Sequence, residues 1–323
     1  MNNKSLTRIF IVLAAVFAAA LLCGTLYDLP VAQALYIKAC RPAMVIGFTG
    51  FALYFACCTF FLGVLFRQLL NSSEKALRRA VVVAAFVYLY LSTAILLGAG
   101  ILNDRLFTGV FAFPVTFGSC LCTGSVFYIP LFIFGAVSNG TRYDKELVKK
   151  AVKLVIIMTF VFLLSTYLNC TVIRPHYRLL ADPAAEFTPW YQLKGTGKLF
   201  MSIPDLISSH PGSFTSGHAM YGILFLVLFP SLSEVFPSLK GKEKILMITG
   251  GAIGLAVMFS RMITGDNYLS DIALGAIAAI KMCFSYALPK KGSRLKTIWQ
   301  KAAGLTRTGK APDAGNRRDK NDA

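Results

Sequence analysis

The chain has 323 residues, of which 56% are hydrophobic, 13% aromatic and 15% charged, and it carries a formal net charge of +18. Its apolar residues gather in repeated runs of about 20 residues, the length needed to cross the ~30 Å hydrocarbon core of a bilayer. This composition excludes an ordinary soluble globular protein and predicts a polytopic membrane protein.

Eight apolar runs are expected to form transmembrane helices, so the predicted fold class is an all-α integral membrane protein. The fourth run is interrupted by Pro114 and Pro130 and is therefore expected to bend. The fifth leads into the longest internal loop, which carries Trp190 and Tyr191, aromatic residues suited to a membrane interface. The eight runs are 9–27, 43–66, 80–102, 108–137, 151–173, 218–236, 245–259 and 270–288.

Three regions follow from the order of these runs. Residues 1–137 are expected to form an N-terminal membrane region of four spans, and residues 138–289 a membrane core that contains the other four. Residues 290–323 are rich in Lys, Arg, Gly and Asp and contain few large apolar side chains. That composition predicts a basic, disordered cytoplasmic tail.

The distribution of basic residues predicts the orientation in the cell membrane. Of the 33 Lys and Arg residues, 24 lie in the segments that share a side with the two termini and 8 lie in the segments on the other side. Because cytoplasmic segments carry the excess of basic residues, both termini are expected to be cytoplasmic. The same distribution accounts for the high net charge, and no nucleic-acid partner is expected.

No metal or cofactor is predicted. Most of the eight cysteines lie in or beside apolar runs, and their spacing is not that of a zinc site. The three histidines are too scattered for a zinc motif, and the chain contains no Walker-type glycine loop.

Polar residues stand at the junction of the last two spans, in the stretch Ser260–Asp271. An arginine at the edge of a membrane span is costly unless it faces a partner or a cavity, so Arg261 with Asp266 close by indicates a candidate site. The alternative is an interfacial arginine that reaches lipid phosphates. By the orientation above, this stretch opens on the extracytoplasmic side, together with the stretches Arg174–Arg178 and Ser213–His218.

The stretch Ser213–His218 supplies hydroxyl groups, a glycine and an imidazole at the expected start of a helix. Backbone N–H groups at such a helix start attract anions. Arginines and hydroxyls can hold a phosphate, and a histidine beside them can protonate a leaving oxygen. Together, the three polar stretches predict a site that handles phosphoryl groups.

Two of these stretches carry a family resemblance. Phe-Thr-Ser-Gly-His at 214–218 resembles a Pro-Ser-Gly-His motif, and Ser260-Arg261-x5-Asn267-x3-Asp271 resembles Ser-Arg-x5-His-x3-Asp. Both motifs are those of the type 2 phosphatidic acid phosphatase and vanadium haloperoxidase superfamily. The resemblance covers mostly residues 150–290, and it implies that the last four spans form a phosphatidic acid phosphatase-like helical core. It also implies a phosphorylated lipid as substrate or ligand, either a lipid phosphate or a polyprenyl diphosphate, with no metal.

The resemblance implies roles for individual residues. The family uses a histidine as nucleophile where this chain has Asn267, an aspartate to orient it where this chain has Asp271, and a general acid at the position of His218. These three are the candidate catalytic residues. The candidate phosphate-binding residues are Ser216, Gly217, Ser260, Arg261, Arg174, His176 and Arg178.

The chain departs from the family pattern at two points. The carboxamide of Asn267 cannot form a phosphohistidine-like intermediate. The lysine of the first motif is missing, and its position falls at Tyr167 if Arg174 is the motif arginine, or at Asn169 if His176 takes the arginine's place. Weak hydrolysis of a lipid phosphate is therefore expected. Binding without turnover is the first alternative, and a transporter or structural protein is the second.

Overall fold

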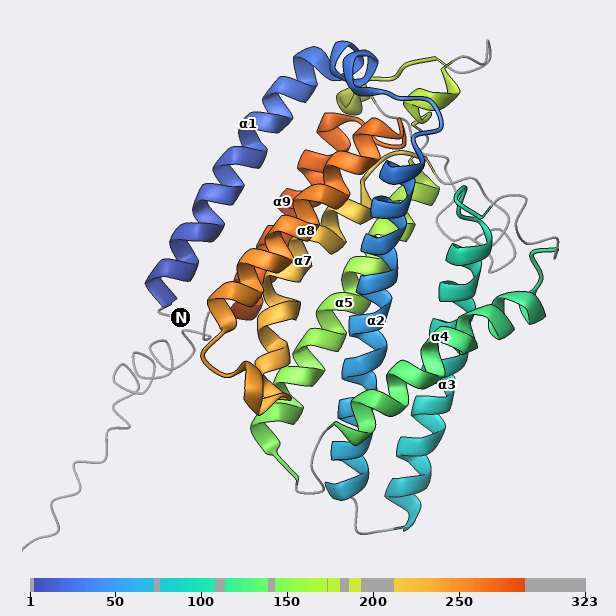
Figure 1. The fold of residues 1–323 in the computed structure, drawn as a ribbon, viewed down its shortest axis with the longest axis vertical. Coiled ribbons are helices and arrows are strands. Elements are labelled where there is room, and N and C mark those ends of the chain that lie inside the picture. Colours follow the sequence, from blue (N-terminus) through green and yellow to red (C-terminus); the bar gives the residue numbers. More distant parts are fainter. Residues whose placement is uncertain are drawn as a thin grey trace, which may run out of the picture. The chain divides into compact units, whose positions relative to one another are not determined.

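The computed structural model describes residues 3–72, 76–107, 114–138, 143–172, 174–180, 186–192 and 212–287. Within these residues the fold consists of eight α-helices with short 3-10 turns, and no strand is formed (Figure 1). Seven of the helices are long and apolar enough to cross a membrane. The expected class, an all-α integral membrane protein, is confirmed.

The first four helices are α1 (Asn3–Leu35), α2 (Arg41–Ser72), α3 (Ala76–Leu102) and α4 (Phe117–Val137). Helix α1 joins the expected first span and the segment after it, with a break from helical geometry at Tyr27 (φ −131°, ψ 18°) and Pro30 just beyond. Helix α4 begins later than expected because Thr116 caps it, accepting a hydrogen bond from Ser119 N at 3.2 Å.

The other four helices are α5 (Lys145–Thr171), α7 (Gly217–Ser231), α8 (Glu243–Ile263) and α9 (Leu269–Ala287). Helix α7 corresponds to the expected sixth span, but with 15 residues it measures only about 22 Å, less than the hydrocarbon core. Most of its side chains are buried against neighbouring helices. Glycines permit the closest of these approaches, since a Cβ on Gly222 would lie 2.9 Å from Gly254 O of α8.

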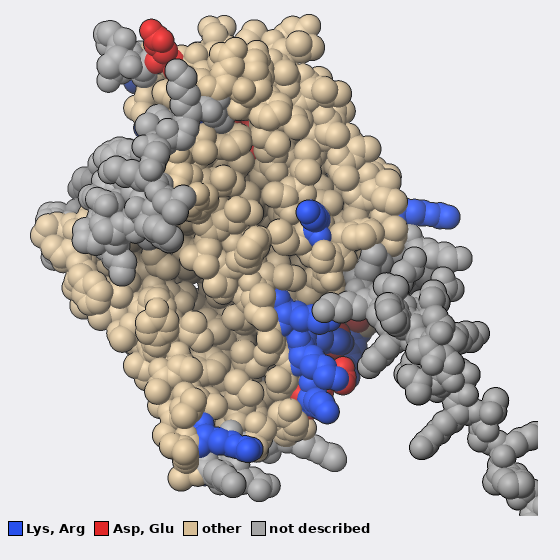
Figure 2. Space-filling view, turned by 180° about the vertical axis from the view of Figure 1, so that it is seen from behind, with Lys and Arg blue, Asp and Glu red and all other residues tan. Residues whose placement is uncertain are grey.

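Residues 1–287 form one compact unit, in which α1 packs along α9 and α2 contacts α5, α7 and α8. The predicted boundary at residue 137 therefore falls inside a single packed unit. Most of the surface in the space-filling view carries neither basic nor acidic side chains, as expected of a surface in contact with lipid (Figure 2). The predicted tail, 290–323, lies outside the described residues.

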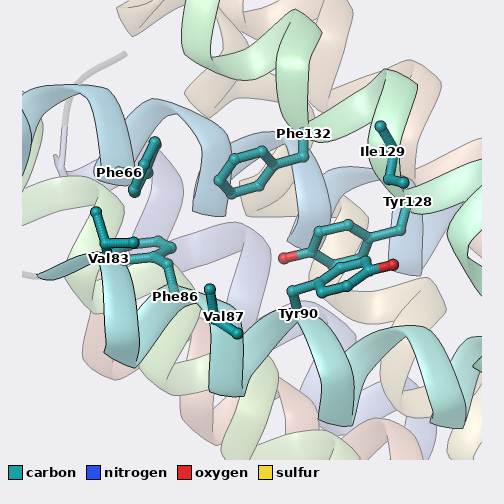
Figure 3. Close-up of a pocket in the computed structure, with 8 residues that line it drawn as sticks. All are labelled: Phe66, Val83, Phe86, Val87, Tyr90, Tyr128, Ile129 and Phe132. Carbon is teal, nitrogen blue, oxygen red and sulfur yellow. The ribbon is translucent and has the colours of Figure 1, made fainter.

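A lateral pocket of about 290 Å³ lies between α2, α3 and α4 (Figure 3). The hydroxyl of Tyr128 points into it and has no hydrogen-bond partner among the described residues. No charged side chain lines this pocket, so it is chemically distinct from the polar end of the bundle. Its lining consists of Phe66, Val83, Phe86, Val87, Tyr90, Tyr128, Ile129 and Phe132.

Candidate anion-binding site

The turn between α8 and α9 brings the key polar residues together. Gly265 adopts a left-handed conformation (φ +66°) that a side chain would strain, and a Cβ there would lie 2.8 Å from the ring of Tyr36. The backbone N–H groups of Asp266 and Asn267 both donate to Arg261 O, at 3.0 and 3.2 Å. This folded turn directs both side chains inward, where each residue is buried.

Three arginines converge on the carboxylate of Asp266. Arg105, from the turn after α3, approaches Oδ1 at 3.2 Å, and Arg178 Nε lies 2.6 Å from the same oxygen. Arg261, from the end of α8, reaches Oδ2 at 3.1 Å, and Thr264 Oγ1 donates to Oδ2 at 2.7 Å. We call Arg105, Arg178 and Arg261 the arginine cluster. Guanidinium groups in such numbers make this end of the bundle a candidate site for anions.

His176 connects the segment after α5 to the same turn. Its Nδ1 lies 2.5 Å from Asp266 O, and the neighbouring Arg178 N donates to Gly265 O at 3.2 Å. Burial, and then the positive charge of Arg178, lower the pKa of His176. The imidazole is therefore neutral at pH 7 and adds no charge to the arginine cluster.

The start of α7 holds the side chain of Asn267. Ser216 caps α7 by accepting a hydrogen bond from Ala219 N at 3.2 Å. The Ser216 hydroxyl also donates to Asn267 Oδ1 at 3.2 Å, and Asn267 Nδ2 donates to Ser213 O at 2.6 Å. Both ends of the carboxamide are thus engaged, and Asn267 is fixed in place between the two motifs.

Buried donors without a partner lie next to the arginine cluster. Among the described residues, neither Arg261 Nε nor His218 Nε2 has a hydrogen-bond partner, although both atoms are buried. The hydroxyls of Ser213 and Thr215 are in the same situation. Arg261 is close enough to His218 to act on it electrostatically. Because a buried polar group without a partner is costly, this arrangement is suited to receive a ligand that accepts hydrogen bonds.

Two further candidate residues lie at the edges of this region. The Ser260 hydroxyl donates to Val257 O at 2.7 Å, within its own helix. Gly217 lies against Ser165, whose Oγ would be 3.2 Å from a Cβ added at the glycine. The Ser260 hydroxyl is thus bonded within α8, and Gly217 allows the start of α7 to lie close to α5.

Arg174 belongs to a separate, fully buried ion network. It donates to Asp28 Oδ2 at 2.8 Å, to Ser270 Oγ at 2.9 Å and to Asp271 Oδ1, and its guanidinium lies 4.1 Å from the ring centre of Tyr268. Its Nε donates to a backbone carbonyl of the loop after α5. With its polar atoms engaged in this way and none of its surface exposed, Arg174 is a structural residue in this conformation, away from the arginine cluster.

Asp271 is engaged by the same network. Its second carboxylate oxygen accepts from Tyr268 N at 3.0 Å, so its hydrogen bonds go to Arg174 and to its own turn. Asp28 of α1 completes the network by accepting from Ser270 N at 2.9 Å. Asp271 thus orients Arg174, while Asn267 accepts a hydrogen bond from Ser216 and donates one to Ser213 O.

Sequence reasoning did not single out Asp28 or Arg105 as site residues. The available signal was their position, since each is an ionisable residue at the edge of an apolar run. Within the described part of the chain, no cluster of His, Cys, Asp and Glu could hold a metal ion.

The fold is that of a helical, multi-pass membrane protein, and at one end of its bundle three arginines surround a buried carboxylate. Residues 147–292 match the PAP2 superfamily, so the chain carries a PAP2 superfamily domain. This agrees with the resemblance seen in the sequence motifs. No curated protein and no solved structure gives a significant match to the chain. The domain contains α5, α7, α8 and α9, whereas Asp28 and Arg105 come from outside it.

Proposed function

We propose that this protein binds the phosphate group of a phosphorylated lipid, a lipid phosphate or a polyprenyl diphosphate, with little or no hydrolysis. The observation that carries the proposal is a pair of buried nitrogens without a hydrogen-bond partner among the described residues, His218 Nε2 and, within the arginine cluster, Arg261 Nε. The PAP2 domain supports a phosphate-ester ligand in general. By the distribution of basic residues, the site opens on the extracytoplasmic face.

The chemistry of the donors favours a phosphate group. Guanidinium groups form strong, charge-assisted hydrogen bonds with phosphate oxygens, and the hydroxyls of Ser213 and Thr215 can add neutral ones. Each buried donor left without a partner costs about 1–3 kcal/mol. A phosphate group that contacts Arg261 Nε or His218 Nε2 removes that cost for the nitrogen it contacts.

The surroundings of the site favour a lipid as the carrier of the phosphate. The site lies at the end of long apolar helices, seven of which can cross a bilayer. Many large apolar side chains are exposed along these helices, including Leu22, Val87 and Phe259. A ligand with a phosphate headgroup at this end can leave its hydrocarbon chain in the surrounding lipid, so only the headgroup has to be desolvated by the protein.

Two features argue against efficient hydrolysis. Asn267 stands at the nucleophile's position and cannot form a covalent phosphoenzyme. Asp271, which would orient a histidine there, is held by Arg174 and Tyr268 N. Any hydrolysis has to use direct attack of water, with His218 or His176 as the groups able to move a proton near neutral pH.

The geometry also favours one of the two ways of aligning the chain with the first family motif. The side chain of Tyr167 is 47% exposed, whereas the carboxamide oxygen of Asn169 is buried and unpartnered among the described residues. His176 contacts the turn that carries Asp266, while Arg174 lies in the separate ion network. We therefore assign Asn169 to the position of the missing lysine and His176 to that of the motif arginine.

The binding proposal is tested with Arg261→Ala. A charge-assisted hydrogen bond contributes about 1.5–3 kcal/mol, so the variant is expected to bind inorganic phosphate or orthovanadate about 10- to 100-fold more weakly. Isothermal titration calorimetry on the purified full-length protein in detergent measures this. Arg78→Ala, which removes an exposed arginine at the start of α3, is the matched control and is expected to bind normally.

Unchanged phosphate binding by folded Arg261→Ala would refute the assignment and leave a transporter or structural role as the better description. Phosphate release from a panel of lipid phosphates and polyprenyl diphosphates then measures turnover. Little release by the unmodified protein is the expected result.

A further inference from the structure

The carboxylate of Asp266 lies where a bound oxyanion would find its donors. Its two oxygens lie 2.6–3.2 Å from guanidinium nitrogens of the arginine cluster. One of them, Oδ2, also accepts a hydrogen bond from the Thr264 hydroxyl at 2.7 Å. These donors come from separate parts of the chain: the turn after α3, the segment after α5, and α8 with the turn that follows it. The side chain of Asp266 is only 5% exposed.

Asp266 remains charged at every physiological pH. Burial by itself would raise the pKa of this carboxyl group, but Arg261, the Thr264 hydrogen bond and Arg178 outweigh burial and hold the pKa well below its usual range. Asp104 is a second acid close enough to interact with Arg261, Asp266 and Arg105, and burial raises its pKa. Asp266 is the carboxylate that all three arginines contact directly.

An incoming phosphate has to share Arg261 with this carboxylate. Arg261 Nη1 lies 3.1 Å from Asp266 Oδ2, whereas Arg261 Nε is buried and has no hydrogen-bond partner among the described residues. Carboxylate and phosphate oxygens use the same guanidinium donors. Two anions on one guanidinium also repel each other, most strongly where water is excluded.

We propose that Asp266 is a built-in competitor of the anion-binding site, which occupies the arginine cluster in the unliganded protein and lowers its affinity for phosphate. This inference rests on the proposed function. It explains how three arginines can be kept together in one place without a bound anion. It also means that the affinity of the site is set by a residue that need not touch the phosphate.

Asp266→Asn is the direct test. The asparagine has the same shape and can keep the contact with Thr264, while the competing charge is removed. Because the carboxylate no longer competes for the guanidinium groups, Asp266→Asn is expected to bind inorganic phosphate and orthovanadate about 10- to 100-fold more tightly than the wild-type protein does. The matched control is Glu234→Gln, which removes one acidic charge from the exposed ion pair with Lys150. This control is expected to bind phosphate as the wild type does.

The outcomes separate this inference from the proposed function. If the wild-type protein binds phosphate and Asp266→Asn binds it equally or more weakly, Asp266 merely positions the arginines and the competitor inference is wrong. If neither protein binds phosphate or orthovanadate, the proposed function fails as well. Should Asp266→Asn not fold, Asp266→Ser removes the same charge with a smaller side chain. The inference then requires the same increase in phosphate affinity from Asp266→Ser.

Discussion

Asn267 stands where the family motif has its nucleophilic histidine. Its carboxamide donates to Ser213 O and accepts from the Ser216 hydroxyl, so the side chain is held at the junction of the two motifs. Its geometry is well defined, but a carboxamide has no basic nitrogen with which to attack phosphorus. The chemistry at this position is therefore limited by the residue type rather than by its placement.

Asn267→His is expected to restore measurable hydrolysis of a lipid phosphate. A histidine can act as nucleophile there, with His218 as general acid, and we expect turnover to rise by one to two orders of magnitude, about 1.4–2.7 kcal/mol of transition-state stabilisation. Adding Asn169→Lys supplies the missing cation and is expected to raise turnover further. Phosphate release by the purified variants measures both effects.

Asn267→Gln keeps a carboxamide and is the control for Asn267→His, with no gain expected. A phosphorylated intermediate trapped by acid quench in the unmodified protein, together with robust turnover, would contradict this account. His176 would then be the first residue to examine as an alternative nucleophile.

Elements outside the PAP2 domain complete its polar end. Helix α1 brings Asp28 to the buried Arg174, and Gly24, one turn earlier, allows the close approach, since a Cβ there would lie 2.7 Å from Ser270 N. The turn after α3 brings Arg105 to Asp266. The first contact is fully buried and the second is partly open to solvent, so the two ion pairs are expected to differ in their contribution to stability.

Asp28→Ala is expected to destabilise the folded protein far more than Arg105→Ala. Removing Asp28 deprives a fully buried guanidinium of one partner, which costs about 3–5 kcal/mol. The side chain of Arg105 is 36% exposed, and an ion pair of that kind contributes about 0–1 kcal/mol. Thermal unfolding of both variants in the same detergent compares them. Equal losses of stability would show that α1 is not docked through this ion network.

At the scale of the whole molecule, the question is which face of the membrane carries the site. The ends of α1 and α5, the turn after α3 and the α8–α9 turn meet at one end of the bundle, as the contacts of Ile37 with Ile263 and of Arg105 with Asp266 indicate. Basic residues are concentrated in the segments at the opposite end. The extracytoplasmic placement of the site follows from that asymmetry and stays a prediction.

Cysteine labelling in a cysteine-free background tests this orientation. Tyr191→Cys lies in the loop after α5, where the native side chain is 55% exposed, and it is expected to react with a membrane-impermeant reagent added to intact cells. Lys242→Cys, between α7 and α8, is expected to react only after permeabilisation. The reverse pattern would place the site on the cytoplasmic face, and its lipid ligand would come from the inner leaflet.

The sequence by itself determined the membrane class, the helices and the positions of the motifs. Long apolar runs give helices because backbone groups inside a bilayer must bond within their own segment. Ser216 caps the start of α7, Arg261 lies in the last turn of α8, and Asn267 lies in the turn between α8 and α9, close to the expected junctions of apolar runs. These properties depend on residues that are neighbours in the chain, so they can be predicted from short stretches of the sequence.

Only the tertiary structure decided which charges meet. By sequence, Arg174 is a candidate phosphate-binding residue, yet its partners are Asp28, 146 residues away, and Asp271, 97 residues away. Arg105 meets Asp266 across 161 residues. Hydrogen bonds and ion pairs act over a few ångströms, so their partners are set by how the helices pack. No local pattern records that packing, and for this reason the arginine cluster and its internal carboxylate could be found only in the folded chain.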